Sequence, residues 1–238
     1  MQTPSMDTRV SKCLEIATYS IRMFGKFPTN VVLTALAADM LAAKTNLATA
    51  QEQYEAAVKE ILPARVDVKY ENHGSDRRVR LTQQKVEIAD GKKGGRIAAL
   101  VFPEGSASIT RLLGDSQIKA MSDLEGRLES ATTLWADAAG EKADIAKHRE
   151  AYAAVLKYRS DVGQDVRNKR ALRNAAKEAF VTKYAEIASR VAAEFPRDTV
   201  MQDLFFDEVR TKSALAQADE DGETAADGEG NTGESKTG

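Results

Sequence analysis

The sequence has few of the residues on which metal, redox and disulfide sites depend. Its 238 residues include one cysteine, Cys13, and two histidines, His73 and His148. A single cysteine cannot form an internal disulfide, which is typical of proteins in a reducing compartment, so we expect a cytoplasmic protein. A di-iron site needs inward-facing Glu-x-x-His pairs, but Tyr70 and Ile145 stand three residues before the histidines. We therefore expect neither a metal site nor another cofactor, and we expect Cys13 to be an ordinary buried helical cysteine.

Sequence signatures of catalytic and nucleotide-binding sites are also absent. None of the patterns Gly-x-Ser-x-Gly, His-Glu-x-x-His and Gly-x-Gly-x-x-Gly occurs. The glycine-rich segment Gly91–Arg96 has its residues in the wrong order for a phosphate-binding loop, which ends in Gly-Lys-Ser/Thr and opens a helix. No set of nucleophile, base and orienting residue can be named, so we expect that the protein is not an enzyme.

Proline, aromatic residues and long apolar runs are scarce as well. Five prolines and an aromatic content of 6% argue against a sandwich of many short strands. No apolar run reaches the ~18–20 residues of a membrane span, and no charged-then-apolar leader opens the chain, so we expect no membrane association. Charged residues make up 29% of the chain, which is typical of long helices with much exposed surface.

Apolar residues at heptad spacing dominate the stretch Asn30–Leu62. One column contains Leu33, Met40, Leu47, Tyr54 and Ile61. The column three residues later contains Leu36, Ala43, Ala50 and Ala57. This spacing is typical of a helix packed lengthwise on another helix. Because Pro28 precedes the stretch and Pro63 follows it, the pattern predicts a helix of ~30 residues, about 45–50 Å long.

The stretch Gln117–Ala139 repeats this two-column pattern. Its columns are Met121, Leu128 and Trp135, and Leu124, Ala131 and Ala138. The matched spacing predicts that the two stretches pack side by side and antiparallel, with their alanine columns inward. A further apolar stripe reaches Phe195 and thins near Gly140 and Gly163, and the sequence leaves open whether a helix breaks at either glycine. Short helices are expected over Asp7–Phe24 and Asp203–Val209.

Residues 63–105 have a different pattern. Val66, Val68 and Tyr70 alternate with charged residues, which is the period of a strand, and Ile97–Phe102 is a second short apolar run before a proline. The pattern over residues 76–90 fits either a helix or a strand. We expect a small β-hairpin or irregular insertion at about residues 63–105.

The C-terminal residues differ in charge from the rest of the chain. Residues 213–238 hold seven acids and one lysine, a net charge of −6, which leaves +4 on residues 1–212. Such an acidic, glycine-rich segment with almost no large apolar residues predicts a disordered tail. We expect residues 1–212 to form one mainly α domain, an elongated antiparallel helical bundle or coiled coil.

The strongest binding signal is a group of cations on one predicted helix. The candidate partner-binding residues are Arg159, Arg167, Arg170, Arg173 and Lys177. At ~100° per residue, all of them except Arg167 share a stripe about 60° wide. They could form a solvated face, pair with Glu52, Glu55 and Glu60 of a neighbouring helix, or bind an acidic protein or the acidic tail. A nucleic-acid surface is the last possibility, weakened by the small charge of the body and by the lack of interleaved aromatic residues.

The leading hypothesis for function is a non-enzymatic helical scaffold or adaptor that acts through protein–protein contacts, including self-association. The alternative hypothesis is a nucleic-acid-associated helical protein that uses the basic stripe 159–177. The sequence specifies neither the partner, nor the oligomeric state, nor the biological process.

Overall fold

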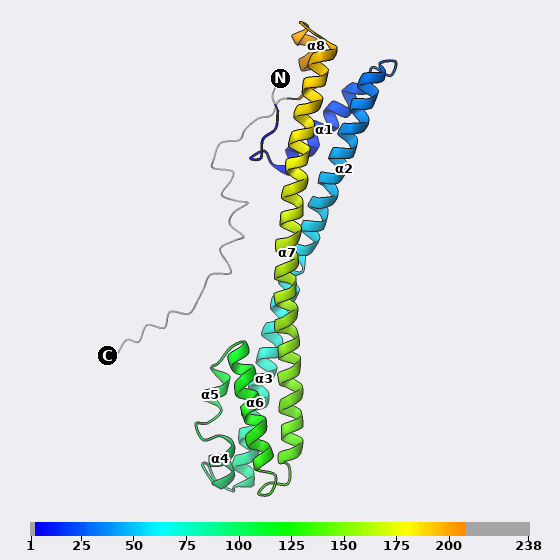
Figure 1. Cartoon of the computed structure of the whole chain (residues 1–238). Coiled ribbons are helices and arrows are strands. Elements are labelled where there is room, and N and C mark those ends of the chain that lie inside the picture. Colours follow the sequence, from blue (N-terminus) through cyan, green and yellow to red (C-terminus); the bar gives the residue numbers. More distant parts are fainter. Residues whose placement is uncertain (1–2, 208–238) are drawn as a thin grey trace, which may run out of the picture. The chain divides into compact units, whose positions relative to one another are not determined.

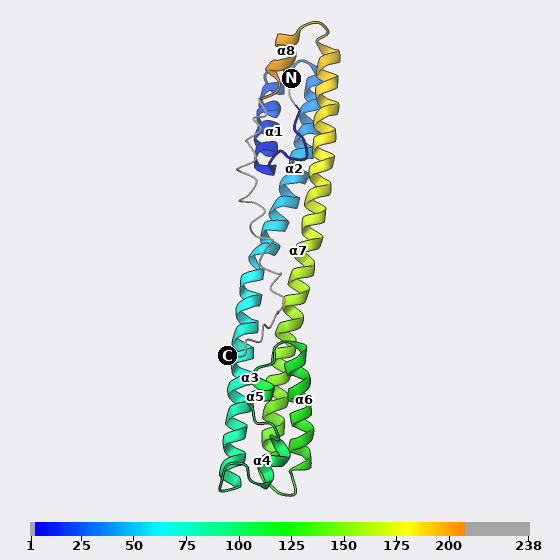
Figure 2. The same cartoon turned by 90° about the vertical axis from the view of Figure 1, so that its left-hand side faces the viewer.

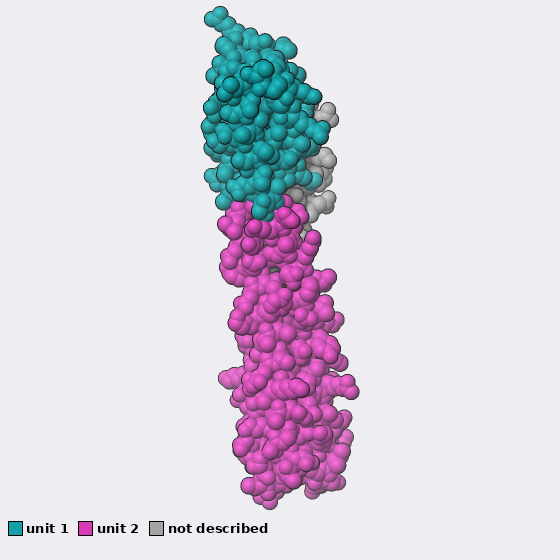
Figure 3. All heavy atoms as spheres, turned by 90° about the vertical axis from the view of Figure 1, so that its right-hand side faces the viewer, with its two compact units in different colours: residues 1–49, 175–238 teal, residues 50–174 magenta. Residues whose placement is uncertain are grey.

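The chain is mainly helical, as the sequence predicts. The computed structural model describes residues 3–207, and within that range it contains eight helices and no strand (Figure 1). The predicted disordered tail, residues 213–238, lies outside the described residues. The chain forms two compact units, coloured separately in Figure 3. Of the described residues, unit 1 contains 3–49 and 175–207, and unit 2 contains 50–174.

Unit 1 combines the N-terminal and C-terminal helices. It contains α1 (Val10–Phe24), the first part of α2 (Val31–Lys59), the last part of α7 (Ala138–Glu194) and α8 (Thr199–Leu204) (Figure 2). Asn30 donates to Glu194 at 2.9 Å, and Arg190 pairs with Asp39 at 3.5 Å. Low residue numbers of the α2 region thus meet high numbers of α7, so the two helices run antiparallel in this unit.

The first half of the heptad columns of α2 is buried in the core of unit 1, whereas Ile61, the last residue of one predicted column, is 43% exposed. Leu33, Leu36, Met40 and Leu47 are fully buried. The α7 residues of the same cluster are Phe180, Tyr184, Ile187, Ala188 and Val191. The prediction of a helix with this buried face is confirmed for residues up to Leu47, but its predicted pairing with Gln117–Ala139 is wrong. A heptad pattern specifies which face of a helix is buried and leaves the partner helix open.

Aromatic side chains close the end of unit 1 at α8. Asp198 caps α8 by accepting a hydrogen bond from the backbone nitrogen of Met201 at 2.9 Å. The chain then buries Phe205, whose ring lies 5.2 Å from Phe24 and 5.6 Å from Phe195, centroid to centroid. Aromatic pairs at these separations are favourable beyond the apolar area that they bury.

Unit 2 has its own hydrophobic core. It contains α3 (Ile61–Ala89), α4 (Arg96–Val101), α5 (Ala107–Thr110) and α6 (Asp115–Ser130), with the end of α2 and the first part of α7. Both predicted columns of Gln117–Ala139 are buried here. They pack with residues of α3, α4 and α7, which are Val79, Val86, Ile97, Val101 and Ile145. The helix predicted to reach Ala139 ends at Ser130, and a turn leads into α7.

The predicted β-hairpin at residues 63–105 is wrong, because this segment forms α3, α4 and α5. Pro63 is the third residue of α3, in the first turn, where its missing N–H has no intrahelical partner to lose. Only Glu60, which is itself in the α conformation, separates α2 from α3. The alternating residues Val66 and Tyr70 are four apart and therefore share one helix face instead of one sheet face.

The segments left open by the sequence are helical. Residues 76–89 belong to α3, and α7 continues through Gly140 and Gly163 for 57 residues without interruption. A glycine inside a helix costs only about 1 kcal/mol relative to alanine. Burial of Ile145 and Tyr152 in unit 2 and of Phe180 in unit 1 offsets this cost.

One helical stretch, Val31–Ala89, is apolar enough by length and composition to cross a membrane. The core helix of a globular protein meets the same criterion. Here the buried residues Leu33 and Met40 belong to the core of unit 1, and Asp39 forms an ion pair with Arg190. Only 22% of the apolar window within this stretch is buried inside the protein.

Candidate partner-binding surface

The five cations predicted to bind a partner all lie on α7, but their environments differ. Arg159, Arg167 and Arg170 are exposed, whereas Arg173 and Lys177 are half-buried. The first four belong to unit 2 and Lys177 to unit 1. The helical spacing is therefore as predicted, but the structure does not present the five as one set of equally exposed side chains.

Arg173 is held by its own chain. The guanidinium carbon lies 4.4 Å from the ring centroid of Tyr54 on α2, a cation–π contact of ~0.5–1 kcal/mol. Its Nη2 also donates to the side-chain oxygen of Asn174 at 3.0 Å. Close by, the ammonium of Lys169 donates to Gln53 at 3.3 Å. Arg173 thus holds α7 against α2 within unit 2 and is a poor candidate for a partner contact.

The ion pairs expected with the acids of the neighbouring helix are not found for four of the cations. Within residues 3–207, Arg167, Arg170, Arg173 and Lys177 form no ion pair with Glu52, Glu55 or Glu60. Instead Glu60 accepts a hydrogen bond from the hydroxyl of Tyr158 at 3.2 Å, and this bond is the main cause of the raised pKa of Tyr158. Arg167 donates to Gln164 at 2.8 Å.

Arg159 has a different role, because it lines a hollow in unit 2. The hollow has a volume of about 420 Å³ and lies between α3, α7 and the turn before α6. Two more cations line it, Arg65 and Lys69 of α3. The remaining lining residues are Val68, Asn72, Leu113, Gly114, Tyr152 and Leu156. No acidic residue lines the hollow, so its rim is positively charged.

Tyr152 fixes the wall of this hollow. Its ring is buried, and its hydroxyl accepts a hydrogen bond from the backbone nitrogen of Gly114 at 3.0 Å. Gly114 has a φ of 60°, a left-handed conformation that suits glycine, and it starts the chain into α6. The bond ties the α6 turn to α7, which leaves the neighbouring side chain of Leu113 exposed at the hollow.

The sequence reasoning missed this hollow. The alternating pattern predicts a strand that includes Lys69, on the same side as Asp67. On a helix, Arg65, Lys69 and Asn72 fall at positions i, i+4 and i+7, which lie on one face. This spacing in the sequence is the signal that could have indicated a shared helix face. Proximity to Arg159 could not be read from the sequence.

A second hollow lies at the C-terminal end of α3. It has a volume of about 510 Å³ and is lined by Glu87, Ile88, Lys92 and Lys93, among others. Here an acid lies beside the two lysines, so the charges of the lining partly cancel. The glycine-rich segment Gly91–Arg96 is thus part of a wide hollow of mixed charge.

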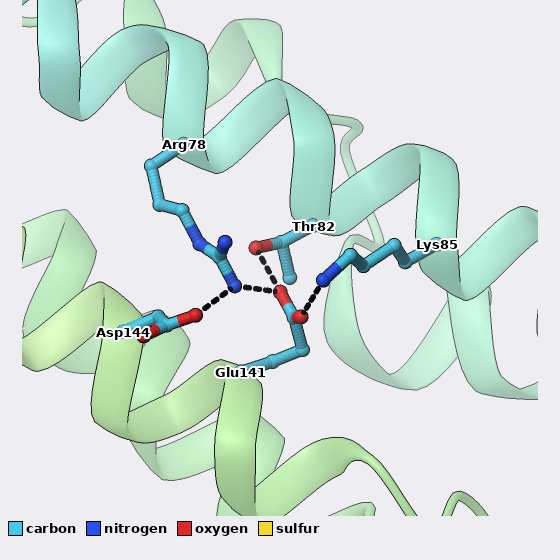
Figure 4. A network of polar contacts seen from close by, with 5 residues as sticks. All are labelled: Arg78, Thr82, Lys85, Glu141 and Asp144. Atoms are coloured by element: carbon cyan, nitrogen blue, oxygen red, sulfur yellow. Dashed lines mark hydrogen bonds and ion pairs between the residues drawn. The ribbon is translucent and has the colours of Figure 1, made fainter.

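A polar cluster joins α3 to α7 within unit 2. Figure 4 shows Arg78, Thr82 and Lys85 of α3 converging on Glu141 of α7. The carboxylate of Glu141 accepts from Arg78 and from Lys85 at 2.5 Å each, and from the hydroxyl of Thr82 at 2.8 Å. Arg78 also pairs with Asp144 at 2.7 Å.

The ionised form of Glu141 is favoured by its partners. Burial alone would raise the pKa of this carboxyl. The hydrogen bonds from Lys85 and Thr82, together with the charges of Arg78 and Lys85, outweigh burial and lower the pKa below its ordinary value. Glu141 therefore stays ionised at neutral pH in spite of its burial.

No family model matches the sequence, and the comparisons with curated proteins and with solved structures give no match.

Cys13 and the two histidines complete the inventory of reactive groups. Cys13 is fully buried in unit 1, and burial raises the pKa of its thiol, as the prediction of an ordinary buried cysteine implies. His73 is exposed on α3, and the backbone carbonyl of His148 accepts a bond from Ser75. Residues 3–207 contain no group of three or more His, Cys, Asp or Glu side chains placed to hold a metal ion.

Proposed function

We propose that the protein is a non-enzymatic helical scaffold or adaptor that acts through contacts with another protein chain. The observation that carries this proposal is a stretch of unit 2, residues 50–63 and 153–174, whose helices bury almost no side chains. Residues 50–63 bury only Ala57, and residues 153–174 of α7 bury no residue at all. Helices of this length are normally stabilised by burial of an apolar face, so an incomplete core supports contact with further helices.

Exposed apolar side chains continue along α3 from the end of this stretch. Leu62, Val66 and Tyr70 follow one another at four-residue spacing on α3, with exposed fractions of 59%, 55% and 73%. We call these three residues the α3 stripe. The outward face of a helix in a globular protein is normally polar, and aligned exposed apolar groups are typical of an interaction surface. A partner helix laid along the α3 stripe would cover all three side chains.

A second candidate function is binding of single-stranded nucleic acid. It is favoured by one observation, the exposed ring of Tyr70 beside the exposed cations Lys69 and Arg77 on α3. An exposed aromatic ring among cations is a platform on which a base can stack.

A capture experiment with matched variants tests both functions. The tagged full chain is used to capture partners from native extract, and its own mass is measured in solution by light scattering. The stripe variant carries Leu62→Ser, Val66→Ser and Tyr70→Ser. The control variant carries Val31→Ser and Val200→Ser, two side chains of unit 1 that are also exposed.

A scaffold predicts that a defined protein, or a second copy of the chain, associates with wild type and with the control variant but not with the stripe variant. Thermal melts should be similar for all three proteins, because the substituted side chains are exposed. A monomeric chain that captures no protein would contradict the scaffold. If the chain instead binds generic single-stranded RNA, and this binding weakens with salt and requires Tyr70, the result would favour nucleic-acid binding over the scaffold function.

A further inference from the structure

The cations at the hollow of unit 2 are placed where their own helix cannot neutralise them. Arg65 and Lys69 lie one turn apart on α3, so their side chains are neighbours. The residues three and four positions from either of them are Ile61, Leu62, Val66, Val68, Asn72 and His73. None of these is an acid, and within residues 3–207 neither cation forms an ion pair. An anion from outside would relieve the repulsion between the two charges.

The floor of the hollow is apolar. Val68 and Leu156 are half-buried there, the ring of Tyr152 is buried, and Leu113 stands exposed at one side. The volume of about 420 Å³ is within the usual range for sites that accept a side chain or a small ligand. An apolar floor with a cationic rim is complementary to an apolar anchor flanked by carboxylates.

We propose that this hollow binds an acidic, amphipathic segment of a partner protein. An apolar side chain of the segment rests on Val68 and Leu156, and its carboxylates pair with Arg65 and Lys69. The proposal rests on the scaffold function and names the class of partner. Carboxylates suit the site better than a nucleic-acid backbone does, because several of its lining residues are apolar and the backbone N–H of Gly114 already donates to Tyr152.

The experiment uses the full chain and a defined probe. The probe is a short fluorescent peptide that forms an amphipathic helix of leucine and glutamate, and its counterpart has lysine in place of glutamate. Binding is followed by fluorescence anisotropy at low and high salt. The hollow variant carries Arg65→Glu and Lys69→Glu, and a milder version carries Arg65→Gln and Lys69→Gln. The control variant carries Lys119→Glu and Lys147→Glu, which change the net charge equally at exposed sites of unit 2.

The Leu/Glu peptide should bind wild type, and salt should weaken the binding. The hollow variant should bind at least about tenfold more weakly, because the new acids repel the peptide at the point of contact. The glutamine version should lie between wild type and the hollow variant. The control variant should stay within about twofold of wild type, since charges far from the contact are screened. Leu113→Ser should also weaken binding, through loss of apolar contact.

Four results would overturn the proposal. The first is an equal loss of affinity in the hollow and control variants, and the second is equal binding of the Leu/Lys peptide. The third is tighter binding of polyuridine RNA that is lost in the hollow variant, and the fourth is a dimer of the chain that needs Arg65 and Lys69. If the hollow variant still captures the partner that depends on the α3 stripe, the scaffold function stands and the hollow has no part in it.

Discussion

Replacement of Glu141 by alanine should destabilise unit 2 by about 3 kcal/mol. The substitution removes the acceptor for Arg78, Lys85 and Thr82 at one step. Loss of one partner from a buried charged network costs ~3–5 kcal/mol, because the remaining charges stay buried without full compensation.

The solvent exposure of each partner of Glu141 determines where within ~3–5 kcal/mol the loss of unfolding free energy should fall. Glu141 is 4% exposed and Arg78 is 12% exposed, so both charges are desolvated. Arg78 retains Asp144, and Lys85 is 44% exposed and can turn to water. Both features reduce the cost to the lower end of the range. Glu141→Gln retains an acceptor oxygen for Thr82 and should cost about half as much.

The single tryptophan of the chain provides an assay specific to unit 2. Trp135 is buried in the same hydrophobic cluster as Ile145. Ile145 lies one helical turn after Glu141 on α7. Urea unfolding followed by its fluorescence therefore reports the unit in which the network lies. The control is Lys142→Ala, at the residue next to Glu141. It breaks an exposed ion pair with Glu129 and should lower the unfolding free energy by no more than ~1 kcal/mol.

The outcome that would refute this reasoning is a Glu141→Ala variant that unfolds at the same urea concentration as Lys142→Ala. The network would then be a set of surface contacts with no net effect on stability. A second substitution checks the origin of the cost. Arg78→Met combined with Glu141→Leu should recover part of the loss, because apolar replacement of a buried pair is often neutral or stabilising.

Three further predictions concern pH and packing. Because its partners lower the pKa of Glu141, its stabilisation should be complete above pH ~4.3 and lost as pH falls further. The difference in unfolding free energy between wild type and Glu141→Gln should therefore be constant from pH ~6 to ~8 and shrink by pH ~3. Phe205→Ala should cost ~3–5 kcal/mol in unfolding followed by circular dichroism, and Phe205→Leu much less, because the ring is fully buried against Phe24. Arg173→Gln should cost only ~0.5–1 kcal/mol, equal to the contact with Tyr54, and a Tyr54→Leu background should abolish that cost.

The helices of this chain could largely be predicted from its apolar spacing. Columns such as Leu33–Met40–Leu47 and Met121–Leu128–Trp135 are buried as expected, because a heptad repeat leaves few other ways to cover a face. The segment after Pro63 could not be predicted in this way. Val66, Val68 and Tyr70 have β propensity, but the helix is stabilised by the burial of Val79 and Val86 further along α3, and tertiary packing overrides local preference.

Partner choice between helices depended on information absent from any one segment. The heptad columns of α2 and those of Gln117–Ala139 have the same spacing, so spacing alone predicts that the two stretches pack together. The chain instead buries the first half of α2 in one hydrophobic cluster with Phe180 and Tyr184 of α7. The hollow was hidden for the same reason, since Arg159 and Arg65 come together only through the antiparallel arrangement of α3 and α7 in unit 2.

The composition of unit 1 from early and late parts of the chain has a consequence for biosynthesis. Cys13, Phe24 and Leu47 are buried against Phe180 and Phe205, and residues 50–174 are translated between them. At ~5–20 residues per second, the ribosome needs about 6–25 s to make that intervening segment. For this time α1 and the first part of α2 carry an uncovered apolar face on the nascent chain. These two helices are therefore the segment that molecular chaperones would meet first, and their docking is a late event in folding.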